Sequence, residues 1–148
     1  MNVALSAEIS ADIRSSNPIH TLAGYLTRHF RDRHYGDDVE EFIVGIICTR
    51  PELDFFFKVR GLKYIAHKTI THDGISVIAH KSLSYDVKID YSAFLAGNES
   101  ERIALLAKSL VDSLSILTKM PKKVKQFDVA SFQHDMTVFL NDPSNLAN

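Results

Sequence analysis

The dipeptide Asp73-Gly74 is the feature that most constrains how this chain can fold. It lies between two stretches that suit β-strands, residues 64–71 and 75–83, and Asp-Gly is a favoured pair for a two-residue hairpin turn. The sequence therefore predicts an antiparallel hairpin whose register is set by the turn. The facing pairs in this register include His67 with His80 and Ile70 with Val77.

Four other segments have the apolar patterns of strands. Apolar side chains occupy every second position in residues 3–9, 55–60 and 85–91, as they do in half-buried strands. Residues 42–49 are apolar on both alternations and rich in β-branched side chains, which suits a strand covered on both faces. We expect this last segment to lie at the centre of a sheet.

Helical periodicity marks three further segments, residues 17–35, 98–120 and 128–141. Each begins at a residue that can cap a helix, and each ends close to a glycine or a proline. In the second segment, Asn98 and Glu101 have the spacing of a capping box. All three helices are predicted to be amphipathic and to pack with one face against the sheet.

Together these elements predict an α+β fold. We expect an antiparallel meander of five to six strands, including the Asp-Gly hairpin, with about three helices packed on it. Residues 1–143 would form a single domain, and residues 144–148 a short polar tail. A chain of 148 residues, 45% of them hydrophobic, can bury roughly 70% of the surface that its unfolded form exposes.

Charge and cysteine content narrow the expected partners. Seventeen basic and 18 acidic residues give a formal net charge of −1, so no global field attracts nucleic acid or an anionic membrane. The single cysteine, Cys48, can form no internal disulfide, and its apolar surroundings predict a buried thiol. Residues 1–8 lack the basic start of a secretion signal. We therefore expect a cytoplasmic protein that contacts neither membrane nor nucleic acid.

The sequence contains no phosphate-binding loop, dinucleotide fingerprint, Cys-x-x-Cys pair or nucleophile elbow. The main remaining lead for chemistry is the pair His67 and His80, which the hairpin register places side by side. Such a pair can share a divalent metal or titrate together. No acid or cysteine in the same short stretch completes a site, and a partly exposed sheet face is the simpler interpretation. A small metal-assisted or acid/base enzyme remains the alternative hypothesis, and no cofactor is predicted.

Two groups of carboxylates are candidates for recognition. The acidic loop, Asp37 to Glu41, carries four acids between a helix and a strand, where they can be a solvated loop or a recognition patch. Asp86 and Asp90 share a strand face with Lys88, which is typical of a polar outer surface. The predicted partner-binding residues are Asp37, Asp38, Glu40, Glu41, His67, His80, Asp86 and Asp90.

The strand end Tyr85-Asp86-Val87-Lys88-Ile89-Asp90-Tyr91-Ser92-Ala93-Phe94 leads through a Gly-Asn break into the helix that contains residues 102–114. This arrangement resembles the immunity-44 family of small bacterial immunity proteins from polymorphic-toxin systems. In that family an Ile-Asp-Tyr-x-x-Phe strand end precedes a helix of this type. The opening residues 6–9 are also similar to the start of proteins in this family. The resemblance covers about half of the chain, and its motif is structural rather than chemical.

The resemblance implies a cytosolic antidote that binds and blocks a cognate toxin domain, as in contact-dependent inhibition. If the toxin is a nuclease, the acidic residues would mimic phosphates. No binding residues are carried over from the family. A third hypothesis is a non-catalytic adaptor that forms a homodimer through an edge strand.

Overall fold

The computed structural model describes residues 1–9, 17–66 and 68–147. Within them the strands form a four-stranded sheet, in the order β1-β2-β6-β3, and a separate two-stranded sheet, β4-β5. The strands are β1 (Asn2–Ile9), β2 (Glu41–Cys48), β3 (Lys63–Ile65), β4 (Lys68–His72), β5 (Ile75–Ala79) and β6 (Ser82–Lys88). The α-helices are α1 (Asn17–Phe30), α2 (Tyr91–Ala96), α3 (Glu99–Ser113) and α4 (Val129–Asn141). Three 3₁₀ helices are η1 (Pro51–Phe56), η2 (Leu114–Lys119) and η3 (Pro143–Leu146).

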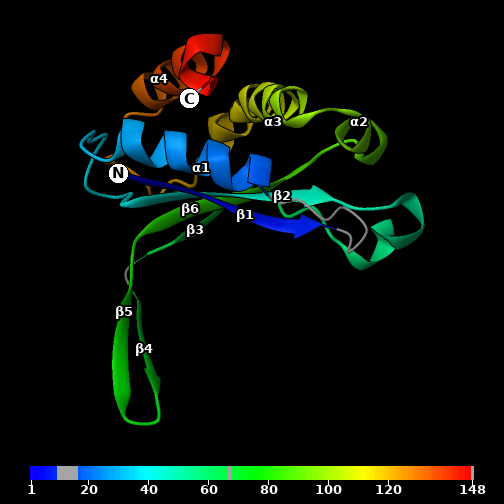
Figure 1. Ribbon diagram of the computed structural model, residues 1–148. Coiled ribbons are helices and arrows are strands. Elements are labelled where there is room, and N and C mark those ends of the chain that lie inside the picture. Colours follow the sequence, from blue (N-terminus) through cyan, green and yellow to red (C-terminus); the bar gives the residue numbers. More distant parts are fainter. Residues whose placement is uncertain (10–16, 67, 148) are drawn as a thin grey trace.

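The helices cover one face of the four-stranded sheet (Figure 1). Helix α1 packs on β1, and α3 packs against α1 and α4. The hairpin β4-β5 extends away from the helices on the other side of the sheet (Figure 1). The α+β class is therefore confirmed. Within the described residues, the helices cover one face of the sheet and leave the other uncovered.

The core lies between β2, β6 and the helices. Phe42, Val44 and Ile46 alternate along β2 and are completely buried, as the period of a strand requires. The ring of Phe42 packs edge-on against that of Phe132 from α4, with centroids 4.8 Å apart. Leu22 of α1 is also fully buried. Core formation thus joins elements that lie far apart in the sequence.

The structure confirms the predicted hairpin turn and the predicted start of α3. Asp73 and Gly74 both have positive φ, 50° and 77°, and Ile70 pairs with Val77 as predicted. The Asn98 side chain accepts the Glu101 N–H, and the Glu101 carboxylate accepts the Asn98 N–H, so the capping box is confirmed. His67 lies outside the described residues, and so does its predicted pairing with His80.

The antiparallel meander is wrong. In the four-stranded sheet, strands β1, β2 and β6 run parallel to one another, and β3 is antiparallel to its neighbour β6. The reason lies in the connections. Helix α1 returns the chain to the starting end of β1 before β2 begins, and η1, β3 and the hairpin β4-β5 lie between the parallel strands β2 and β6. The sheet is therefore mixed.

The strand predicted at residues 55–60 is also wrong. Residues Pro51–Phe56 form η1, which begins with proline at its first turn. The stretch predicted as one strand at residues 85–91 is divided between β6 and the short helix α2, which was not predicted. Helix α1 ends at Phe30, short of the predicted stop at Gly36. Residues 144–146, placed in the predicted tail, belong to η3.

Candidate functional site

The acidic loop is fixed to the linker that precedes α4. The Asp38 carboxylate accepts the backbone N–H groups of Lys125 and Gln126 at 2.7 and 2.8 Å. The Asp38 N–H in turn donates to the Gln126 carbonyl at 3.2 Å. These bonds favour the charged form, so the pKa of Asp38 lies below its usual value. Asp38 therefore holds the loop in place.

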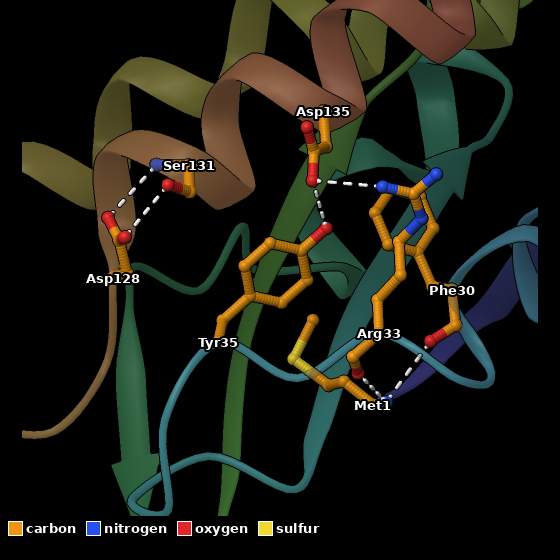
Figure 2. A network of polar contacts seen from close by, with 7 residues as sticks. All are labelled: Met1, Phe30, Arg33, Tyr35, Asp128, Ser131 and Asp135. Carbon is orange, nitrogen blue, oxygen red and sulfur yellow. Dashed lines mark hydrogen bonds and ion pairs between the residues drawn. The ribbon is translucent and has the colours of Figure 1, made fainter.

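The chain just before this loop is tied to α4. Figure 2 shows the Tyr35 hydroxyl donating to the Asp135 carboxylate at 2.5 Å, while Arg33 reaches the same oxygen at 3.3 Å. The Met1 ammonium donates to the carbonyls of Phe30 and Arg33 at the end of α1. Burial, reinforced by the bond to Asp135, raises the pKa of Tyr35, which keeps the phenol neutral. The entry to the acidic loop is thus well defined.

The exposed acids of this loop meet the base of the hairpin. The Glu40 carboxylate lies 2.9 Å from Nδ1 of His80, and the Asp37 carboxylate lies 3.1 Å from Nε2 of His34. The Lys81 ammonium donates to the Asp37 carbonyl at 3.4 Å. We call Asp37, Glu40 and His80 the acidic edge. The structure therefore brings together two of the segments that the sequence proposed as one surface.

A shallow hollow of about 390 Å³ adjoins the acidic edge. Residues of the N-terminal strand and of the loop after α1 line it, among them Asn2, His34, Asp37 and Glu40. Glu41, the last acid of the loop, starts β2 and is half-buried, and its N–H donates to the Lys81 carbonyl. The loop thus offers Asp37 and Glu40 to a partner more fully than Glu41.

Asp86 and Asp90 do not belong to this edge. The Asp86 side chain is 5% exposed and accepts the backbone N–H and Nε of Arg60 at 2.8 and 2.9 Å. Asp90 caps α2 by accepting the Ala93 N–H at 2.8 Å. Asp90 follows the end of β6 that is remote from His80. Both acids organise the fold locally, and the eight predicted residues do not form one cluster.

The described residues contain no group of three or more His, Cys, Asp or Glu side chains that could hold a metal ion. Cys48 is buried, and burial raises the pKa of its thiol to about 11, so it stays protonated at neutral pH. Among the described helices none is long and apolar enough to cross a membrane.

Comparison with known protein families decides the affiliation. A family model described as immunity protein 44 matches residues 1–142. The chain belongs to the immunity protein 44 family. The resemblance seen at residues 85–94 is thereby confirmed and extends over most of the chain. No curated protein and no solved structure gives a significant match.

One surface of this immunity protein 44 member was missed by sequence reasoning. Phe55 and Phe56, at the end of η1, are 78% and 68% exposed. Their rings stack with centroids 4.0 Å apart. Pro51 was a signal for a helical turn here, but the alternation of Phe55, Phe57 and Val59 suggested a strand instead.

The role of Asp38 predicts a loss of stability in acid. The pKa of Asp38 is lowered in the folded protein, so the unfolded chain binds the proton more tightly. Its contribution is complete above the unfolded pKa of about 4 and is lost as the pH falls through the lower folded value. We expect Asp38→Asn to flatten the decrease of the unfolding free energy between about pH 5 and pH 2, measured by urea titration at several pH values.

Asp37→Asn is the matched control, because the Asp37 carboxylate is exposed and its ion-pair partner is the exposed His34 ring. An acid-induced loss that is equally steep in Asp38→Asn and in the unsubstituted protein would show that these backbone bonds do not depend on the charge of Asp38.

Proposed function

We propose that this protein neutralises a cognate bacterial toxin domain by binding it directly, and that it acts by contact and not by catalysis. The match of the immunity protein 44 model over residues 1–142 carries this proposal. The different contacts of the acidic residues also support this proposal. Asp38, Asp86 and Asp90 accept hydrogen bonds within the fold, whereas Asp37 and Glu40 present their carboxylates at the surface.

The acidic edge is the part of the proposed surface that selects a partner by charge. Because the net charge of the whole chain is only −1, attraction of a basic partner must be local. Two exposed carboxylates, Glu40 beside His80 and Asp37 beside His34, provide such a local field. A toxin that acts on nucleic acid has a basic active site, where these carboxylates would take the places of phosphates. The complex would form in the cytoplasm of the protected cell.

The proposal is tested by co-expressing this protein with the C-terminal domain of the protein that is encoded immediately upstream of it. We expect growth to be rescued and the two proteins to purify as a stable stoichiometric complex. The pairing is refuted if this protein is folded, the upstream domain is demonstrably toxic, and growth is not restored and no complex is purified.

Charge reversal at the acidic edge tests the surface. In Asp37→Lys with Glu40→Lys, two attractive charges become repulsive, so we expect affinity for the toxin domain to fall by roughly 10- to 100-fold. Most of the loss should be in the association rate, and it should shrink at high salt because exposed charges are screened. Association and dissociation rates at two salt concentrations would show this.

Glu99→Lys with Asp112→Lys is the matched control. It makes the same change in net charge on exposed positions of α3, in the helix layer. If both double variants bind the toxin domain equally well, the acidic edge is not part of the contact.

A further inference from the structure

The segment that follows β2 displays apolar side chains to solvent. Phe55 and Phe56 are 78% and 68% exposed, and Val59 is 48% exposed. The two rings contact each other, with an angle of 34° between their planes, and neither belongs to the buried core. Scattered single apolar residues are normal on a surface, whereas contiguous exposed apolar patches mark interaction sites.

Hydrogen bonds hold the N-terminal end of this segment to β6, so we call residues 54–60 the braced segment. The Asp54 carboxylate accepts the Thr49 hydroxyl at 2.7 Å and the Lys88 ammonium at 2.8 Å. The Asp54 carbonyl also accepts the N–H of Phe57, which closes the end of η1. These bonds favour the charged carboxylate and lower the pKa of Asp54. The residue immediately before the aromatic pair is therefore held by strand and loop together.

The second side of the segment is braced as well. The backbone N–H and Nε of Arg60 donate to the Asp86 carboxylate, and the Asp86 N–H donates to the Arg60 carbonyl at 2.9 Å. Asp86 is 5% exposed, so this contact is built into the fold. Asp54 and Arg60 are thus tied to Lys88 and Asp86 of β6, while Phe55 and Phe56 between them are exposed.

The braced segment borders the sheet face that the helices leave uncovered. In Figure 1, η1 lies at the end of the sheet opposite to the projecting hairpin β4-β5. A hollow of about 240 Å³ lies between strands and segment, lined by Ile43, Lys63, Ile65 and Ser84 together with Arg60 and Gly61. Arg60 thus belongs both to this hollow and to the stretch that carries the aromatic pair.

We propose that Phe55 and Phe56 are the apolar anchor by which this protein binds its toxin partner, inserting into an apolar pocket on that protein. This inference rests on the proposed function and names the residues and the kind of pocket involved. Lys58, two positions after Phe56, is exposed, so the fitting pocket has an acidic residue at its rim. A few aromatic side chains in such pockets carry most of the energy of a protein interface.

The bracing explains why such an anchor would be effective. Phenylalanine has only two side-chain torsions, so little conformational entropy is lost when its ring is immobilised. The contacts from Asp54 and Arg60 fix the backbone on both sides before binding. The cost of ordering the segment is therefore met during folding and not during association.

The test compares full-length variants in binding to the upstream-encoded toxin domain. We expect Phe55→Ala with Phe56→Ala to weaken binding by about 100-fold or more, chiefly through faster dissociation. Its thermal midpoint should stay close to that of the unsubstituted protein, because both rings are mostly exposed. Leu95→Ala with Val138→Ala is the control, since these residues are 45% and 56% exposed on the helices. That variant should bind normally.

Each other result overturns the inference in a recognisable way. If the affinity of the phenylalanine variant is within about threefold of that of the unsubstituted protein, the two rings are not the anchor, and the proposed function is unaffected. A marked decrease in thermal midpoint would show that the rings pack within this chain. A homodimer that dissociates only in the phenylalanine variant, with toxin binding retained, would assign the pair to a second copy. Absence of any complex with the unsubstituted protein would refute the proposed function, and the anchor with it.

Discussion

Replacement of Phe132 by alanine is expected to lower the free energy of unfolding by about 3 to 5 kcal/mol, the range for removing a buried aromatic ring. Phe132 is completely buried. Its ring centroid lies 4.8 Å from that of Phe42 on β2, 5.3 Å from that of Tyr35 and 5.8 Å from that of Phe30. One side chain thus joins α4 to the sheet and to the end of α1. Denaturant titration followed by circular dichroism measures the loss.

Val138→Ala is the control within the same helix, because Val138 is 56% exposed. It should change the free energy of unfolding by no more than about 0.5 kcal/mol. If Phe132→Ala fails to fold, Phe132→Leu keeps part of the volume and should cost less than the alanine variant while remaining measurable. Equal stability of the Phe132 and Val138 variants would contradict the packing described for α4.

The features that the sequence predicted correctly depend on residues close together in the chain. The hairpin register follows from the backbone preferences of Asp73 and Gly74, which tolerate positive φ. The start of α3 follows from Asn98 and Glu101, three positions apart. In both cases every partner is within a few residues, so the pattern alone is sufficient.

The direction of the strands depends on connections, which the local pattern does not contain. A run such as residues 42–48, apolar on both faces, is typical of a parallel strand, and this signal was present. The strong hairpin nevertheless suggested that all neighbours were joined by tight turns. In the structure the hairpin forms its own two-stranded sheet and leaves the parallel pairing of β1, β2 and β6 intact.

The roles of the acids could not be separated from sequence for a related reason. Asp38 and its backbone partner Gln126 are 88 positions apart, and Asp86 and Arg60 are 26 apart. Composition shows which residues can carry charge, whereas tertiary contacts decide which of them are used inside the fold. The same contacts explain η1, since Asp54 is held by Lys88, 34 positions away.

Gly36→Ala is expected to be the second most damaging substitution, with a loss of about 2 to 5 kcal/mol in the free energy of unfolding. Gly36 has a φ of +135°, which side chains rarely allow. A Cβ atom there would also come within 1.9 Å of the Gln126 carbonyl oxygen. The obstacle is backbone, so it cannot rotate away. Thermal and denaturant unfolding measure the effect.

Gly61→Ala separates this cause from a general effect of replacing glycine, because a Cβ at Gly61 meets nothing within 4 Å. It should be nearly neutral in stability. In Gly36→Ala the clash falls where Asp38 binds Lys125 and Gln126, so the acidic loop must move away from the linker. A stable Gly36→Ala protein would therefore refute the close approach of loop and linker. A different result would be a Gly36→Ala protein that is destabilised and, while still folded, binds the toxin domain more weakly. That result would show that the contact between loop and linker positions Asp37 and Glu40 for binding.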